Sequence, residues 1–539
     1  MVIELSNLTF TNQADIVPES GVEQIFNTGI ANTLAGNDRI TGIGVDYYSS
    51  AYGFINYGTL NTDEGDDVIT GTGVISGFRN SGTFNTGEGN DIVTANAQQN
   101  GSALDNIGTF NTGEGNDTIT ANNKVGAGLE NTGTFNTGEG DDVITAKTNV
   151  GIGFSNSGTF NTDEGDDVIT AKTLFGAGFE NTGTFNTGEG DDAIAGEGYF
   201  KGILTNSGSI FDTGDGNDKI CGDSKNAPGI PNSGGIFNYS STFNTGDGND
   251  TIEGIGRYGI YNATVIDTGN GKDIITASSS VATTSSNETG GIYNLGTINT
   301  GSNDDIITST AVVNNQGVIK SGTGLSNKGT INTSDGNDSI ISTGNFTNRG
   351  NVFLGEGNDS IAADTDFSDR ALENFGFIGT GDGNDTITST GIIYNQGVIE
   401  TGNGDDSIIV DGGIDDITGT TYGIYNNGGA INMGDGNDSI IANEGFESAP
   451  NSSGAWFLGE GDDYLKGFGS GDFYGGNGND TLELTPGTYT VGIWGEGGES
   501  PIFTKGDQLM ITSEFEKLKA GSTIYDFTSL TAGQIIIVA

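Results

Sequence analysis

The chain has no histidine and a single cysteine, Cys221, among its 539 residues. Histidine acid–base chemistry, histidine metal sites, intramolecular disulfides and cysteine zinc sites are therefore excluded. It also has only 6 prolines, and 18 lysines and arginines together. No apolar run approaches the roughly 18 residues of a membrane-spanning helix. No Lys or Arg precedes Arg39, so the N-terminus does not resemble a secretory signal.

Glycine and acidic residues are what the chain has in abundance. There are 96 glycines, and 72 Asp and Glu give a formal net charge of -54. This balance argues against nucleic acid or anionic membrane as partners and favours cations. Low hydrophobicity with high charge is typical of disorder. A repeating sequence changes that interpretation. Stacked repeats share one continuous core, so a few apolar residues in each repeat are enough to form it.

A phrase such as GTFNTGEGNDTIT, residues 108–120, returns along almost the whole chain. Aligned on the last Asp of its Gly-rich turn, the phrase occurs eighteen times, at spacings of 17 to 33 residues. We call this residue the anchor Asp; in the quoted copy it is Asp117. An aliphatic residue follows it by two positions, as Ile119 does. Apolar residues also stand seven and thirteen positions before it, as Phe110 and Leu104 do.

Three short strands per copy, each with an inward apolar residue, indicate one coil of a three-sided β-solenoid. We therefore predict an all-β fold, a parallel and by expectation right-handed β-solenoid of about 18 coils with terminal caps. The predicted parts are an N-terminal cap over 1–24, solenoid repeats over 25–484 and a C-terminal β cap over 485–539. An Asn column from Asn27 to Asn451, with Asn206 as one member, predicts a side-chain amide ladder at a corner.

The Gly-rich turn places carboxylates at the same point of every coil. Gly stands two residues before the anchor Asp in seventeen of the eighteen copies and four residues before it in fourteen. In a parallel stack, anchors of adjacent coils lie about 4.8 Å apart. Two unit charges at that distance repel by roughly 1 kcal/mol in water and by more at a partly buried site. Lys and Arg are too few to offset this, so the turns predict a divalent hard cation. Ca²⁺ suits a flexible Gly turn better than Mg²⁺, which demands a stricter octahedron.

The turns resemble the calcium-binding repeats of the repeats-in-toxin (RTX, haemolysin-type) family, GGxGxDxUx with U aliphatic. The match is closest over 459–484, where GEGDDYLKG precedes GGNGNDTLEL. The resemblance implies Ca²⁺ held between neighbouring turns by the Asp carboxylate and by carbonyls of the glycine region. Most copies here carry one acidic turn in a coil of about 25 residues, whereas RTX places two in about eighteen, so the calcium geometry need not be the family's.

By this resemblance the calcium ligands are the anchor residues Asp67, Asp91, Asp117, Asp142, Asp167, Asp192, Asp218, Asp250, Asp305, Asp338, Asp359, Asp385, Asp406, Asp438, Asp463 and Asp480. Asp38 is left out because its turn lacks the first glycine. Asp273 is left out because it follows Lys272.

The predicted function is structural. We expect a secreted, calcium-binding solenoid at a bacterial surface or in an extracellular matrix, serving as a surface layer, filament subunit or adhesin part. The resemblance implies type I secretion and folding outside the cell, where Ca²⁺ is plentiful. Expected partners are calcium ions, and surface polysaccharide or further copies stacked head to tail. No catalytic constellation stands out, so no enzyme is predicted.

Two alternatives stay open. Six consecutive copies, from Thr59 to Asn186, show Thr-x-Asn facing outward, a pattern that resembles ice-binding solenoids and would also suit a glycan. Parallel β-helices also include polysaccharide-active enzymes. Those need charged groups gathered in one groove, whereas Lys and Arg are scattered here.

Overall fold

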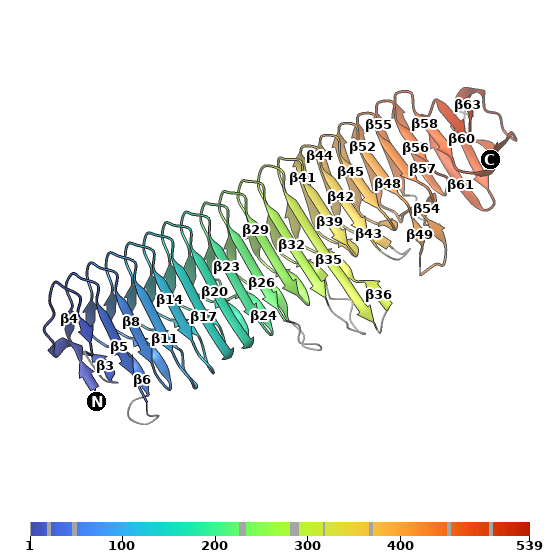
Figure 1. The fold of residues 1–539 in the computed structure, drawn as a ribbon. Helices are drawn as coiled ribbons and strands as arrows, with labels where there is room; N and C mark the ends of the chain where they lie inside the picture. The colour runs from blue at the N-terminus through green and yellow to red at the C-terminus, as the bar shows by residue number, and fades with distance from the viewer. Residues whose placement is uncertain are drawn as a thin grey trace. The chain divides into compact units, whose positions relative to one another are not determined.

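The computed structural model describes residues 2–18, 23–45, 51–225, 233–280, 290–315, 318–365, 370–415, 417–449, 454–494 and 500–539. Contacts divide the chain into two units, Met1–Asn270 with Ile275–Ser278 and Gly271–Ile274 with Ser279–Ala539. The predicted fold is confirmed: both units are parallel β-solenoids in which each coil gives one strand to each of three ladders, named A, B and C. Figure 1 shows strands of one ladder lying side by side within each unit.

In the first unit, the strands of ladder A are β1 (Val2–Glu4), β3 (Gln24–Asn27), β6 (Tyr52–Asn56), β9 (Ser76–Asn80), β12 (Leu104–Asn106), β15 (Leu129–Asn131), β18 (Phe154–Asn156), β21 (Ala177–Asn181), β24 (Lys201–Thr205), β27 (Gly234–Asn238) and β30 (Tyr258–Asn262). Those of ladder C are β4 (Ile30–Asn32), β7 (Thr59–Asn61), β10 (Thr83–Asn85), β13 (Thr109–Asn111), β16 (Thr134–Asn136), β19 (Thr159–Asn161), β22 (Thr184–Asn186), β25 (Ile210–Asp212), β28 (Thr242–Asn244) and β31 (Val265–Asp267). Those of ladder B are β2 (Ile16–Val17), β5 (Arg39–Ile43), β8 (Val68–Thr72), β11 (Ile92–Asn96), β14 (Thr118–Asn122), β17 (Val143–Val150), β20 (Val168–Phe175), β23 (Ala193–Gly198), β26 (Lys219–Ser224) and β29 (Thr251–Gly256).

In the second unit, the strands of ladder A are β33 (Gly290–Asn294), β37 (Thr323–Asn327), β40 (Asn345–Asn348), β43 (Arg370–Asn374), β46 (Ile392–Asn395), β51 (Ile424–Asn426) and β54 (Phe446–Ser448). Those of ladder C are β34 (Thr297–Asn299), β38 (Thr330–Asn332), β41 (Asn351–Glu356), β44 (Phe377–Asp382), β47 (Val398–Asn403), β52 (Ala430–Asp435), β55 (Ala455–Glu460) and β57 (Gly471–Asn477). Those of ladder B are β35 (Ile306–Asn315), β39 (Ser339–Thr343), β42 (Ser360–Asp364), β45 (Thr386–Ser389), β48 (Ser407–Val410), β53 (Ser439–Ala442), β56 (Tyr464–Lys466) and β58 (Thr481–Leu484).

The remaining elements are the strand at the division of the units, the hairpin strands, the C-terminal strands and two short turns. They are β32 (Ile274–Ser280), which has residues of both units, the hairpin strands β36 (Val318–Ser321), β49 (Gly413–Ile414) and β50 (Thr421–Tyr422), the C-terminal strands β59 (Gly487–Trp494), β60 (Ser500–Lys505), β61 (Gln508–Ser513), β62 (Lys517–Ala520), β63 (Thr523–Asp526) and β64 (Ile535–Val538), and two 3₁₀ turns, η1 (Leu5–Asn7) and η2 (Phe527–Ser529). No helix among the described residues is long and apolar enough to cross a membrane.

The three predicted apolar columns form the core, because parallel pairing sets equivalent residues of successive coils opposite each other. Phe110 pairs with Phe135 in ladder C, and their rings stack with centroids 4.4 Å apart. The stack continues to Phe160 at 5.0 Å. Ile119 of ladder B and Leu104 of ladder A are buried in the same coil. Each coil therefore contributes only a few core residues, and these pack against the equivalent residues of the neighbouring coils.

The predicted Asn ladder runs along the ends of the ladder A strands. The Nδ2 of Asn106 donates to Oδ1 of Asn131 at 2.8 Å and to the carbonyl oxygen of Thr134 at 2.8 Å. One assignment was wrong: Thr205, not Asn206, stands in the ladder and donates its Oγ1 to Oδ1 of Asn238 at 3.0 Å. A Thr hydroxyl replaces the amide donor there. Asn451 lies outside the described residues.

Repeat geometry extends past both ends of the eighteen aligned turns. Near the N-terminus, Asp15 precedes buried Val17, and β2 pairs in parallel with β5. Within the predicted cap over 485–539, β61 and β62 continue ladders C and B in parallel pairing. Antiparallel strands β60 and β63 then cover them. These turned-back strands protect the last parallel edges.

We expect Phe135→Ala to destabilise the first unit by about 3–5 kcal/mol, because it removes a fully buried ring from a stacked column. The neighbouring Thr134 faces solvent, so Thr134→Ala should change stability by no more than about 0.5 kcal/mol. Denaturant unfolding followed by circular dichroism at fixed Ca²⁺ measures both. Equal effects of the two variants would contradict this assignment of faces.

Candidate functional site

Every acidic turn has the same backbone, built on two residues with positive φ. In one coil these are Gly113 at 103° and Gly115 at 134°. Where the sequence lacks a glycine, the conformation persists: positive φ is found at Leu34, Asp63, Asp163, Asn303 and Ser334. A non-glycine residue in this region is strained. The stack therefore dictates the turn conformation even against local preference.

The glycines also allow the turns to nest. The carbonyl oxygen of Gly87 lies 1.7 Å from where a Cβ on Gly113 would stand, and that of Gly89 lies 2.1 Å from a Cβ on Gly115. Both carbonyls thus point along the stack at the bare glycine of the next coil. A side chain there would force the coils apart. The nesting leaves a row of carbonyl oxygens directed between adjacent turns.

The anchor Asp residues face inward, as Ile119 and its equivalents do. Asp117 is 1% exposed. Its backbone N–H donates to Oδ1 of Asp142 in the next coil at 2.7 Å. The same bond joins the anchors of successive coils from Asp38 to Asp250 and from Asp273 to Asp480. We name this row the Asp column.

All sixteen predicted ligands stand at equivalent places in the Asp column, and so do the two anchors that the sequence left in doubt. Asp38 and Asp273 are buried and take part in the same bonds. Neither a missing first glycine nor the preceding Lys272 displaces the carboxylate. The geometry therefore gives no reason to exclude either residue.

The second carboxylate oxygen of most anchors is buried without a hydrogen-bond partner. This Oδ2 atom is unsatisfied in Asp38, Asp67, Asp91, Asp117, Asp142, Asp167, Asp192, Asp305, Asp338, Asp359, Asp385, Asp406, Asp438, Asp463 and Asp480. Asp218 and Asp250 differ, because Thr213 and Thr245 donate their Oγ1 hydroxyls to these Oδ2 atoms. A buried, unpaired carboxylate oxygen is costly. Fifteen of the eighteen anchors thus bury a carboxylate oxygen that accepts no hydrogen bond, and each of these oxygens would be stabilised by a positively charged partner.

Burial raises the pKa of the column carboxyls far above the ordinary value. Desolvation is the main cause. The nearby Thr hydroxyl and the N–H of the preceding anchor lower the pKa in part, and neighbouring anchors raise it further by like-charge repulsion. The pKa of Asp117 rises to about 7 and that of Asp167 to about 8. In the second unit the pKa of Asp305 rises to about 7 and that of Asp480 to about 6. The column thus favours either protonated carboxyls or a bound positive charge.

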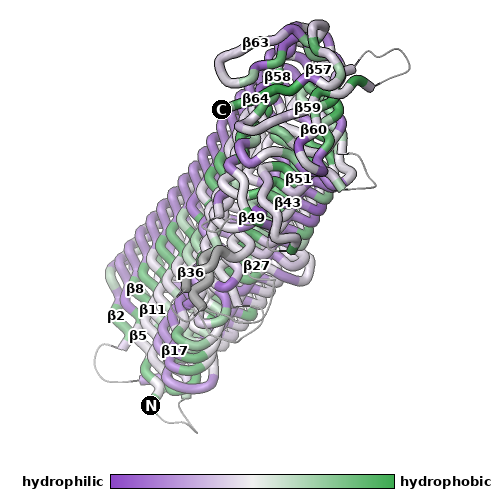
Figure 2. Tube along the Cα trace, turned by 90° about the vertical axis from the view of Figure 1, so that its right-hand side faces the viewer, coloured by the Kyte–Doolittle hydropathy of each residue, from purple (hydrophilic) through white to green (hydrophobic). Residues whose placement is uncertain are grey.

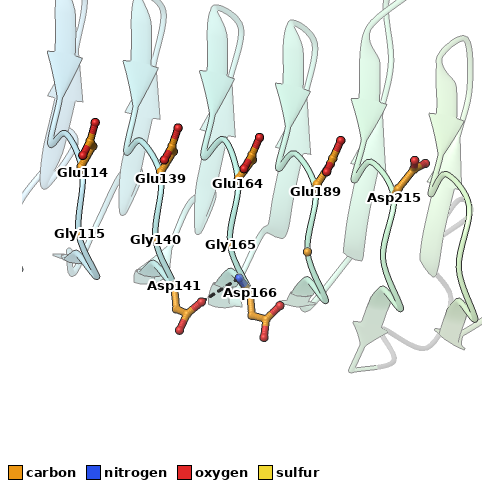
Figure 3. A pocket seen from close by; sticks show the side chains of 11 residues that line it. Glu114, Gly115, Glu139, Gly140, Asp141, Glu164, Gly165, Asp166, Glu189 and Asp215 are labelled. Carbon is orange, nitrogen blue, oxygen red and sulfur yellow. Dashed lines mark hydrogen bonds between the residues drawn. The ribbon is translucent and has the colours of Figure 1, made fainter.

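The other turn acids point outward. Figure 3 shows a row of side chains that all point the same way, Glu114, Glu139, Glu164, Glu189 and Asp215. Asp141 and Asp166 lie on the other side of the turn, where the N–H of Asp166 donates to Oδ1 of Asp141 at 3.1 Å. Both rows are open to solvent. We name Glu114 and its equivalents the outer acidic row.

Sequence reasoning missed three parts of the site. A buried Thr stands five residues before most anchors, as Thr112 does, and its Oγ1 donates to the carbonyl of Thr137 at 3.1 Å. Period-two alternation with Phe110 would have placed it inward. At the ends, the N–H of Asp15 donates to Oδ1 of Asp38 at 2.7 Å. The N–H of Asp480 donates to Oε2 of Glu516 at 2.7 Å. Both bonds extend the column beyond the aligned repeats.

The donor set of the column suits a hard cation. It offers carboxylate Oδ2 atoms, turn carbonyls and Thr hydroxyls, all of them oxygen. At Asp480, Oδ2 lies 2.8 Å from where a Cβ on Gly475 would stand, so the carboxylate lies directly beneath its turn. Among the residues that the structure describes, no three His, Cys, Asp or Glu side chains gather into a metal cluster. A cation here would therefore rely on backbone carbonyls as well as carboxylates.

No protein-family model matches the chain, and the search of curated proteins found no match. Among solved structures, one match is a hyperactive, Ca²⁺-dependent, β-helical antifreeze protein from an Antarctic bacterium. The two are 17% identical, the alignment covers 80% of this chain and 84% of that one, and the TM-score is 0.29. A similarity this low transfers no function to the present chain.

Proposed function

We propose that this chain is a calcium-stabilised β-solenoid with a structural role outside the cell. The proposal rests on the Asp column, in which most coils bury one carboxylate oxygen that has no hydrogen-bond partner. A divalent ion between coils would supply these oxygens with a partner and cancel the repulsion along the column. The anchor carboxylates and the turn carbonyls are the residues that would hold it.

Calcium is favoured over other divalent ions by the chemistry of the donors. Ca²⁺ accepts six to eight oxygens in flexible geometry, whereas Mg²⁺ holds its water and needs a strict octahedron. The absence of His and the single Cys leave no soft ligand set for Zn²⁺. Because the ion would bind only where coils are stacked, its binding free energy would become folding free energy.

An extracellular location follows from this coupling. The chain would fold poorly where Ca²⁺ is scarce, as in cytosol, and fully where Ca²⁺ is millimolar. A repeated scaffold bounded by caps suits a surface layer, a matrix component or an adhesin stalk. This part of the proposal is supported by the coil architecture and the acidic composition alone.

We expect Asp117→Asn, Asp142→Asn and Asp167→Asn together to have opposite effects with and without calcium. In chelator at pH 9, where these carboxyls are ionised, the variant should be more stable, because each pair of repelling buried charges removed relieves about 1 kcal/mol or more. In Ca²⁺ it should gain less in Tm than the parent, because three anchor carboxylates are lost. Calorimetric titration should also find fewer bound ions.

The matched control is Glu114→Gln, Glu139→Gln and Glu164→Gln, which removes the same charge from the outer acidic row of the same coils. It should leave the number of bound ions unchanged. A loss of ions from the control rather than from the Asn variant would move the site to the outer row. A parent melt that ignores both Ca²⁺ and chelator would overturn the proposal.

The raised pKa values predict a distinctive pH dependence in chelator. The folded-state pKa of Asp117 is about 7, against 3.8 for the ordinary side chain. Its protonated form therefore stabilises the fold fully below about pH 4, and that stability is lost as pH rises through 7. Tm in chelator should fall between pH 5 and 8. Added Ca²⁺ should raise Tm strongly at pH 8 and little at pH 5. A chelator Tm that rises over this range would contradict the burial of these carboxyls.

A second candidate function rests on the outer face of ladder C in the first unit. From β7 to β22 this face presents Thr and Asn only, in register, without a charged or aromatic side chain. The Asn amides also bond along the stack, as Asn136 does to Asn111 at 3.1 Å. A regular array of neutral side chains, bordered on its Asn side by the outer acidic row, suits an ordered, uncharged surface such as ice. The lack of aromatic side chains makes a glycan less suitable.

If this face binds ice, Thr109→Lys, Thr134→Lys and Thr159→Lys should abolish thermal hysteresis, because each long charged side chain breaks the flat array. The same change at Thr94, Thr120 and Thr145, outward positions of ladder B, should not. Thermal hysteresis of the folded parent in Ca²⁺ is the measurement. A parent without hysteresis would reject the ice function and leave the calcium proposal untouched.

A further inference from the structure

The C-terminal strands form an antiparallel sheet that closes the second unit. Its strand order is β61, β60, β59 and β64. The inner face packs Tyr489, Phe503, Met510 and Ile536, all at most 1% exposed. This inner face completes the core above the last coil.

The outer face of the same sheet carries several exposed apolar side chains, with Thr488 and Thr490 between them. Ile535 and Ile537 of β64 are 53% and 72% exposed, and Trp494 of β59 is 61% exposed. Leu509 of β61 adds a further exposed apolar side chain. Figure 2 shows strongly hydrophobic residues where β59 and β64 are labelled. Exposed apolar side chains gathered on one sheet commonly mark an interaction surface.

Strand β64 also presents an open edge. Among the described residues it pairs with β59 alone, through Thr488 opposite Ile537 and Thr490 opposite Ile535. The N–H and C=O groups along its other side are a template for one more strand. By contrast, ladders B and C end beneath β63 and β60. Head-to-tail stacking of coils would need those covered strands, so β64 offers the more accessible edge.

The charge around this sheet favours a second copy of the same chain as the partner. Residues 487–539, which span this sheet, carry three lysines and six acids, a net charge of -3, whereas the whole chain carries -54. Two copies that approached along their solenoid coils would repel each other strongly. At the C-terminal sheet that repulsion is weaker, and the apolar side chains gain from burial.

We propose that two copies of this chain dimerise through β64, paired antiparallel across a two-fold axis. Antiparallel neighbours directly opposite each other share a face of the sheet. An axis through Ile536 meets this condition, because it sets Ile535 opposite Ile537 of the partner subunit. The result is one continuous sheet across both copies. Such an isologous contact closes at two copies and does not grow into a filament.

The test is the mass of the full chain in solution, by sedimentation equilibrium at tens of micromolar protein in millimolar Ca²⁺. The parent should give twice the 55.2 kDa of one chain. Ile535→Lys with Ile537→Lys should give a monomer with unchanged circular dichroism and Tm. The matched control is Ile30→Lys, an exposed isoleucine at the first strand of ladder C, which should remain a dimer.

Three outcomes would overturn the proposal. They are a monomeric parent, a parent that forms an open series of larger species, and a monomer that sediments with phosphatidylcholine vesicles, which would make the sheet a lipid surface. If the double variant does not fold, Ile537→Thr keeps a β-branched residue on the strand and should still weaken the dimer at least tenfold. The inference does not rest on calcium at the Asp column, since a calcium-independent chain could dimerise equally.

Discussion

In-register stacking sets every side chain of a coil against its own equivalent in the next coil, and the rest of the structure depends on how each residue type meets that condition. Phe and Ile meet it readily, because like apolar groups pack on like. Asn meets it because its amide carries both a donor and an acceptor, so Asn106 bonds to Asn131 at 2.8 Å. A carboxylate has acceptors only. Among the described residues, most members of the Asp column therefore keep one carboxylate oxygen without a hydrogen-bond partner.

The backbone of the Asp column satisfies one of the two oxygens of a carboxylate. Each anchor N–H satisfies one oxygen of the next carboxylate, as Asp117 does for Asp142. The other oxygen is buried without a hydrogen-bond partner, and the pKa of the carboxyl group is raised, as it is at Asp142. Outward acids such as Glu114 face no such problem, because water screens them. The acidic residues of the turns thus form two separate groups. One group lies at the surface in water, and the other is the buried Asp column, whose charge must be neutralised by a proton or a cation.

The coil could be predicted well from the sequence, because the spacing of the residues determines the repeat, the aligned columns and which side chains face inward. The three apolar columns and the Asn ladder follow from aligning the repeats, and the inward direction of Asp117 follows from its alternation with Ile119. Spacing could not separate anchors that differ by one turn residue, so Asp38 and Asp273 were left out although they stand in the same row. Glu516 could not be found this way, because it arrives after the inserted strands β59 and β60 and bonds Asp480 from outside the repeat.

At the end of the solenoid, the strands of the last coil have no further coil with which to pair. A parallel ladder that simply ended would offer unpaired strands to any other chain. Here ladders B and C are covered by strands turned antiparallel, and Glu516 supplies the carboxylate that a further coil would have carried. The turned-back sheet has an edge of its own at β64, in a segment that has lost the acidic turn and carries a net charge of only -3 over 487–539. Along the coils, charge keeps copies apart. Association can therefore occur most easily where the repeat, and with it most of the charge, has ended.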